Sequence, residues 1–222
     1  MEDFDLDRAA LLLLDFQNYG IDPDGYWAKH GEPDWPAVAR PAMENAARAL
    51  AAARQARLLV VHVGVAWRQG SPEANISAPL FSRAPERSVE GTWGAEFCEA
   101  VKPLAGEIVV YKRGVSALAG TELDRLFRIR DVRTLMLSGV ATHFAVEGTA
   151  REAVDRGYRV VVLEDCCASR ERAVHEYSIE RILRNLCEVT TGERLIAELA
   201  ARAERRGGAV IGRSGGEAQG DV

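Results

Sequence analysis

Apolar and polar residues follow one another along this chain in blocks that match the lengths of strands and helices. Five continuous apolar runs have strand length, and Glu188–Thr190 is a weaker sixth candidate. The five runs are Ala9–Asp15, Leu58–Val63, Ile108–Tyr111, Leu135–Gly139 and Val160–Leu163. Because they lack a two-residue alternation, they are typical of strands buried on both faces of a parallel sheet.

Segments with helical spacing separate the apolar runs. Pro36–Arg57 begins with a proline suited to a first helical turn and carries one apolar stripe. The other predicted helices are Glu122–Arg130, His143–Arg156, Arg170–Leu186 and Gly192–Arg202. This alternation predicts an α/β fold, a three-layer sandwich in which helices cover both faces of a doubly wound, mostly parallel six-stranded sheet. Substrates of such folds bind at the carboxyl ends of the strands.

The 222 residues are divided into one domain and a tail. We expect residues 1–204 to form the domain, and residues 205–222, which read RRGGAVIGRSGGEAQGDV, to form a Gly-rich C-terminal tail without helical periodicity. The longest irregular segment, Gly64–Thr92, is too long for an ordinary connection and favours a lid, a binding loop or a contact between subunits.

Composition narrows the class of protein further. A net charge of -5, from 28 basic and 33 acidic residues, argues against a nucleic-acid partner. No apolar run approaches the ~18 residues of a membrane helix, and the N-terminus is acidic where an export signal is basic, so we expect a cytoplasmic protein without a membrane partner. The four cysteines form no C-x-x-C pair and indicate neither a disulfide framework nor a zinc site.

Charged residues stand where two predicted strands end. Asp15 closes the first apolar run and Lys112 follows the third. Taken separately, Asp15 is equally well explained as a helix cap and Lys112 as a solvated charge. A doubly wound sheet can also bring the two together at one edge of the crevice, where the lysine would hold the aspartate ionised as a proton acceptor. A helix beginning near Thr142 or His143 would point backbone N–H groups around Ala145 into the same crevice.

Three motifs together resemble the isochorismatase-like hydrolase superfamily, which includes nicotinamidases, N-carbamoylsarcosine amidohydrolases and ureide hydrolases. They are DFQN after the first strand, GTWGAEF with VKPLAGEIVVYKRGVSALAGTELDRLF around the third, and GVATHFAVEGTAREAVDRGYRVVVLEDCCAS around the fourth and fifth. The resemblance runs from about Arg8 to Leu199. It implies a hydrolase for a small polar metabolite that assembles as a homodimer or homotetramer.

The resemblance also implies roles for individual residues. The family's cysteine hydrolases use an Asp, a Lys and a Cys, which map onto Asp15, Lys112 and Ala145. The family's non-proline cis peptide maps onto the bond between Val140 and Ala141. The backbone at Val140, Ala141 and Ala145 would then hold the substrate oxygen. A methyl group at position 145 cannot attack a carbonyl carbon, so the chain as written is expected to lack thiol-dependent amidase activity.

Three explanations of Ala145 stay open. The superfamily's isochorismatases lack the cysteine and hydrolyse a vinyl ether with the equivalent of Asp15 as an acid, which would require burial to raise the pKa of Asp15 despite Lys112. Alternatively, Ala145 replaces a cysteine by a deliberate change in an amide- or ureide-cleaving enzyme. In the third, the fold has become a binding protein, although the retention of Asp15 and Lys112 speaks against decay.

Further side chains are candidates for the substrate pocket. They are Phe16, Gln17, Trp67, Trp93, Thr142 and His143, and packing under the long loop explains either tryptophan equally well. Arg68 and Arg113 are candidates for binding a substrate carboxylate, with exposed arginine as the commoner outcome. His62 lies within a strand, lacks an acidic partner in its own segment and is better read as a core residue, so no metal and no cofactor are expected.

Overall fold

A single six-stranded sheet organises the molecule. The computed structural model describes residues 5–30, 32–70, 72–82 and 87–211, with side chains up to residue 205. The strands are β1 (Ala9–Leu14), β2 (Leu59–Val65), β3 (Ile108–Lys112), β4 (Thr134–Val140), β5 (Arg159–Ala168) and β6 (Glu188–Thr190). Every neighbouring pair is parallel, in the order β3-β2-β1-β4-β5-β6. This order confirms the predicted doubly wound α/β fold.

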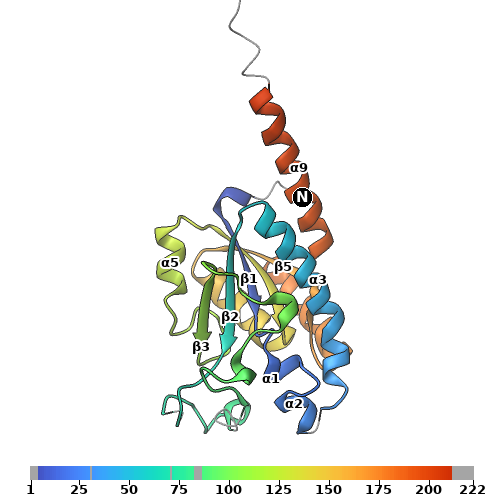
Figure 1. Cartoon of the computed structure of the whole chain (residues 1–222). Helices are drawn as coiled ribbons and strands as arrows, with labels where there is room; N and C mark the ends of the chain where they lie inside the picture. Colours follow the sequence, from blue (N-terminus) through green and yellow to red (C-terminus); the bar gives the residue numbers. More distant parts are fainter. Residues whose placement is uncertain (1–4, 31, 71, 83–86, 212–222) are drawn as a thin grey trace, which may run out of the picture.

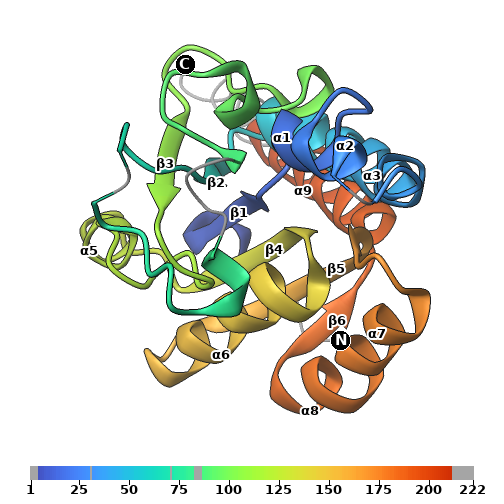
Figure 2. The same ribbon diagram turned by 90° about the horizontal axis from the view of Figure 1, so that it is seen from below.

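Helices cover both faces of the sheet (Figures 1 and 2). One face is covered by α3 (Trp35–Gln55) and α9 (Gly192–Ile211), and the other by α5 (Leu123–Ile129) and α6 (Glu147–Asp155), with the short α7 (Arg172–Tyr177) and α8 (Arg184–Leu186) beside β6. Two further short helices, α1 (Asn18–Ile21) and α2 (Tyr26–Lys29), lie at the carboxyl end of the sheet. The hydrophobic pattern carries no sign of α1 and α2, because four residues are too few to show a helical period.

Successive residues of the central strand fill two separate cores. Leu11 and Leu13 of β1 pack with the apolar stripe of α3 and with Leu195 and Leu199 of α9. Leu12 and Leu14 point the other way, into a cluster with Phe127 of α5 and Ala150 of α6, among others. Because side chains alternate across a strand, a run of four leucines supplies both faces. The continuous apolar runs therefore reflect a sheet covered on both sides.

The end of β5 lies well beyond the end that the sequence predicts. β5 continues five residues beyond Leu163, because a register shift between Leu137 and Gly139 of β4 lets Cys167 and Ala168 pair with β4 again. The polar pair Glu164 and Asp165 hid this continuation from the hydrophobic pattern.

The last helix also runs further than predicted. α9 extends to Ile211, into the segment read as a tail, since helical hydrogen bonding propagates beyond the packed turns. Its upper end projects past the rest of the molecule, away from the carboxyl edge of the sheet (Figure 1). Residues 212–222 lie outside the described residues. Within the described part, no helix has the length and apolar composition needed to cross a membrane.

The long segment after β2 is anchored at its far end. An isolated parallel bridge joins Trp67 and Val89, with Trp67 N donating to Ser88 O at 3.0 Å and Glu90 N donating to Trp67 O at 2.9 Å. The Ser88 hydroxyl donates to Val65 O at 2.8 Å. These bonds hold the end of the loop against the carboxyl end of β2, beside the edge where a doubly wound fold binds its ligands.

Candidate active site

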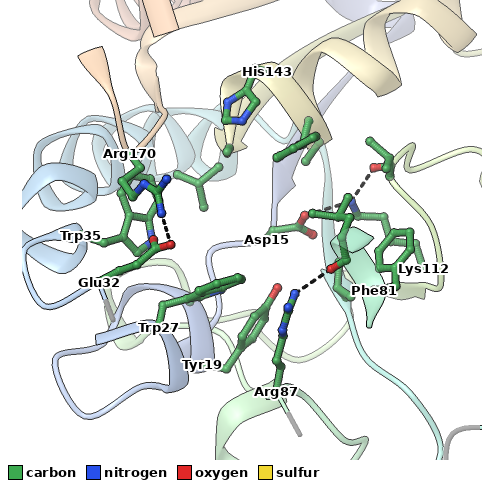
Figure 3. Close-up of a pocket in the computed structure, with 18 of the residues that line it drawn as sticks. Asp15, Tyr19, Trp27, Glu32, Trp35, Phe81, Arg87, Lys112, His143 and Arg170 are labelled. Atoms are coloured by element: carbon green, nitrogen blue, oxygen red, sulfur yellow. Dashed lines mark hydrogen bonds and ion pairs between the residues drawn. The ribbon is translucent and has the colours of Figure 1, made fainter. Parts of the chain in front are cut away.

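A cavity of about 270 Å³ lies at the carboxyl ends of β1, β3 and β4. Asp15 follows the last residue of β1, Lys112 ends β3, and Val140 ends β4, and all three line the cavity together with Ala141 and Ala145. The strand order reverses between β1 and β4, which is the position where open α/β sheets bind ligands. The fold thus gathers the predicted catalytic positions at one site (Figure 3).

The backbone turns sharply at Asp15. Its φ angle is 60°, in the left-handed region that aspartate tolerates better than most residues with a side chain. Asp15 N donates to Val63 O at 2.8 Å, and Gln17 N donates to Asp15 O at 2.8 Å. These bonds hold Asp15 in a strained backbone conformation beside the cavity. Such conformations are concentrated at functional sites.

Asp15 and Lys112 form a buried ion pair. Lys112 Nζ lies 2.9 Å from Asp15 Oδ2, and the two residues are 1% and 9% exposed. Lys112 Nζ also donates to Val115 O at 2.6 Å. Burial raises the pKa of Asp15, and the charge and hydrogen bond of Lys112 offset this only in part. Asp15 Oδ1 is buried without a hydrogen-bond partner among the described residues, so one carboxylate oxygen is left to serve the cavity.

The turn after β4 forms the opposite wall. The peptide bond between Val140 and Ala141 is cis, as expected from the resemblance. A short π-helical segment, Thr142–Val146, follows and leads into α6. Ala145 on this segment is buried and lines the cavity, and it is the residue onto which the resemblance maps the nucleophile.

Gly139 allows β4 to pass close to β1 immediately before this turn. Its φ angle is 151°, and a Cβ atom at this position would lie 2.4 Å from Leu14 O. Only glycine fits both the conformation and the contact. The residue next to Leu14 is Asp15, so the same close approach sets the spacing between the carboxylate and the Val140–Ala145 wall.

His143 also lines the cavity, and its ring is held in place. A hydrogen bond of 2.8 Å joins His143 Nδ1 and Ser169 Oγ. Burial lowers the pKa of His143, which keeps the imidazole neutral at neutral pH. Trp67 lines the cavity as well and is nearly fully buried.

Four sequence-predicted pocket residues do not line this cavity. Phe16 is fully buried in the core beneath α3. The side-chain amide of Gln17 is hydrogen-bonded to the backbone: it donates to Val65 O and Ala95 O and accepts from Val65 N. Thr142 Oγ1 is hydrogen-bonded to His175 Nδ1 at 2.8 Å, and Trp93 is 48% exposed on a different groove. For Phe16, Gln17 and Thr142, proximity in sequence to Asp15 or Ala145 did not decide which way the side chain points.

Sequence reasoning missed most of the remaining wall. The missed residues include Tyr19, Trp27, Glu32, Trp35, Arg87 and Arg170. Several come from the stretch between the first strand and α3, where aromatic residues are dense, and that density was the available signal. Arg170 forms an ion pair with Glu32 across the cavity mouth (Figure 3).

The other charged candidates have partners outside the cavity wall. Arg113 pairs with Glu73 and Glu90, and Arg68 pairs with Glu73, so neither is placed to receive a ligand in the cavity. His62 is fully buried, as expected, but it does have an acidic partner, because Glu107 reaches it across the β2–β3 edge with Oε2 2.9 Å from His62 Nε2. Across the described ranges, no three His, Cys, Asp or Glu side chains converge as a metal site.

Comparison with known proteins identifies the family. The model of the isochorismatase domain matches residues 9–194. The chain belongs to the isochorismatase family. It is 32% identical to the maleamate amidohydrolase of Pseudomonas putida over 194 residues, covering 86% of this chain and 87% of the relative. It is 35% identical to the ureidoacrylate amidohydrolase RutB of Methylorubrum extorquens over 176 residues, covering 73% and 70%.

A solved structure agrees with the sequence matches. An isochorismatase family protein from Desulfovibrio vulgaris superposes with a TM-score of 0.73 at 32% identity, covering 87% of this chain and 98% of that one. The resemblance drawn from the three motifs is therefore confirmed, and with it the assignment to the isochorismatase-like hydrolases. The matched range includes the two charged residues and position 145 of the site described above.

Proposed function

We propose that this isochorismatase-family site is built to cleave the C–N bond of a small amide or ureide, with residue 145 as the position of the nucleophile. The observation that carries the proposal is the buried Asp15–Lys112 pair, which lines the same cavity as Ala145. The relatives named for the hydrolysis of maleamate and ureidoacrylate support a C–N bond as the target. In the chain with Ala145, the binding and proton-transfer groups remain and the nucleophile is missing.

With cysteine at position 145, the reaction would proceed in two stages. Asp15 takes the thiol proton while the sulfur attacks the carbonyl carbon, and the backbone of Ala141 and residue 145 stabilises the oxyanion. The C–N bond then breaks, Asp15 returns its proton to the leaving nitrogen, and a thioester remains. A water molecule attacks the thioester, Asp15 accepts its proton, and the thiol is regenerated as the acid product leaves. Lys112 holds Asp15 in place throughout.

The test is to install the missing sulfur. The Ala145→Cys variant is expected to release ammonia from members of a panel of small amides and ureides, whereas the Ala145 chain should release none above background. Ala145→Ser serves as a matched control, because it adds a polar atom of similar size with a far less nucleophilic group. Silence of the Ala145→Cys variant across the whole panel would contradict the proposal.

A second candidate function is favoured by the raised pKa of Asp15 and its unpartnered Oδ1. A protonated Asp15 could act as a general acid on a vinyl ether in the Ala145 chain, with water adding to the resulting cation. The pH profile separates the two candidates. An acid role requires protonated Asp15, so turnover falls as the pH rises through its raised pKa. A base role in the Ala145→Cys variant requires ionised Asp15, so turnover rises over the same range.

Binding without turnover in both chains is the remaining outcome. This outcome would indicate that the protein binds its ligand without converting it. Calorimetry on the same panel of ligands measures the binding. Retention of the Asp15–Lys112 pair argues against it, because a buried ion pair is costly to desolvate and gives no advantage to a fold that has no use for it.

A further inference from the structure

We propose that Arg87 is the subsite for a carboxylate on the substrate, so that the preferred substrates are monoanionic amides or ureides. The inference rests on the proposed function and assigns the substrate class of the same cavity. It starts from the charges that line the cavity, which are carried by Asp15, Glu32, Arg87, Lys112, Arg170 and Glu171.

Five of these six charges have an opposite charge beside them. Lys112 pairs with Asp15, and Arg170 pairs with Glu32 and, at 3.6 Å, with Glu171. Arg87 has no carboxylate partner within the part of the chain that the structure describes. Its Nε is buried there without a hydrogen bond, whereas Nη1 donates to Leu80 O at 2.8 Å. A partly buried guanidinium with a buried, unpartnered Nε and no counter-charge is unfavourable, and an anionic ligand in the cavity would supply both the charge and the hydrogen bond.

Arg87 is also held ready for a ligand. The next residue, Ser88, begins the segment that is hydrogen-bonded to Trp67 and Val65 at the end of β2. The guanidinium carbon lies 4.5 Å from the centre of the Trp27 ring, a cation–π contact that fixes the plane of the fork. A planar, fixed guanidinium is suited to bidentate recognition of a carboxylate.

The position of Arg87 relative to Asp15 fits a short substrate. Figure 3 shows the guanidinium directed toward Tyr19 and the Asp15 side of the cavity. Both charges act on the Tyr19 hydroxyl: burial and then the charge of Asp15 raise the pKa of Tyr19, and Arg87 opposes them. Tyr19 therefore lies within the field of both groups. A ligand with its carboxylate on Arg87 would present its amide to Asp15 and position 145 a few bonds away.

The test uses the full chain with Ala145 and two ligands of the same skeleton, succinamate and the neutral succinamide. Calorimetry at neutral pH is expected to show that succinamate binds about 10- to 100-fold more tightly, as a charged hydrogen-bonded pair contributes. Arg87→Gln is expected to abolish this preference, so that the two ligands bind with similar affinity, and circular dichroism of the variant checks that it is folded. Arg113→Gln, which removes an arginine paired outside the cavity, is the matched control and should keep the preference.

An Arg87→Gln chain that keeps the preference would overturn the inference, and so would a parent chain that binds both ligands equally or binds neither. Turnover by the Ala145→Cys variant is read separately. If that variant hydrolyses both ligands equally well, the proposed function stands and the Arg87 subsite falls. If the preference for the anion holds while the variant hydrolyses nothing, the subsite stands and the proposed function falls.

Discussion

At the scale of single residues, two opposing forces act on Asp15. Burial favours its neutral form, and Lys112 at 2.9 Å favours its charged form. Burial is the larger, so the pKa of Asp15 is raised even though a cation touches it. A carboxyl group whose pKa is raised holds a proton more readily than a free aspartate does, and this suits a group that accepts and returns a proton within one catalytic cycle.

Removing Lys112 should destabilise the protein in a pH-dependent way. Lys112→Met leaves Asp15 buried without its counter-charge, and we expect a loss of about 3–5 kcal/mol in the free energy of unfolding at pH 7. A raised pKa means that the folded state binds a proton more readily than the unfolded state. The loss should therefore shrink as the pH falls through the folded pKa toward the ordinary value of 3.8.

Urea denaturation at pH 7 and pH 4.5 measures this difference. Lys102→Met is the matched control, because Lys102 is an exposed lysine paired only with Glu99 at the surface. Its removal should change stability by less than about 1 kcal/mol at either pH. If Lys112→Met lowers the free energy of unfolding equally at the two pH values, Lys112 does not stabilise the protein through the charge of Asp15.

At the scale of elements, the site depends on how closely β1 and β4 approach each other. Gly139 permits this approach, and the residues on either side of the contact are Asp15 after β1 and Val140 at the end of β4. One backbone contact therefore positions both the Asp15 side and the Val140 side of the cavity. The starting points of the two segments that carry Asp15 and Ala145 are therefore set by the sheet.

Gly139→Ala should consequently disturb both stability and binding. The added methyl would meet Leu14 O at 2.4 Å, and the φ angle of 151° is unfavourable for alanine. We expect Gly139→Ala to lower the free energy of unfolding by more than about 1 kcal/mol. Gly157→Ala is the control, since Gly157 has a φ angle of 85° and open space around its Cβ position, so it carries the strain without the clash. Equal losses for the two variants, measured by urea denaturation, would exclude the clash as the cause.

The strands could be predicted from the sequence, whereas part of the cavity wall could not. Five apolar runs and their order were enough to predict the sheet, because strands buried on both faces leave a strong signal. Asp15, Lys112 and Ala145 were found because they follow strand ends or match a motif. Arg87, Trp27 and Tyr19 were missed, since they reach the cavity from a loop and from helices of four residues, and their direction is set by tertiary packing.

At the scale of the whole molecule, the cavity is built from two different parts of the fold, to which the proposed function assigns chemistry and binding. The sheet supplies Asp15, Lys112 and the wall that contains Ala145. The segments laid over its carboxyl edge, α1, α2 and the end of the long loop, supply Tyr19, Trp27 and Arg87 (Figures 1 and 3). A division of this kind lets the overlying segments change with the substrate while the sheet keeps the reacting groups in place. On the proposed function, the chain has the groups for binding and proton transfer, and only the sulfur of a cysteine at position 145 is absent.

On the proposed function, position 145 is where a C–N hydrolase site of this fold carries its nucleophile. The test is to mix the Ala145→Cys variant with an amide that it hydrolyses, to quench the reaction rapidly and to measure the intact mass of the protein. Peptide mapping then locates any adduct. We predict a mass increase equal to the acyl group, carried on residue 145, and none on the Ala145 chain, whose four cysteines are elsewhere. Turnover by the Ala145→Cys variant with the acyl group on Cys98, Cys166, Cys167 or Cys187, or turnover of the same amide by the Ala145 chain, would contradict it.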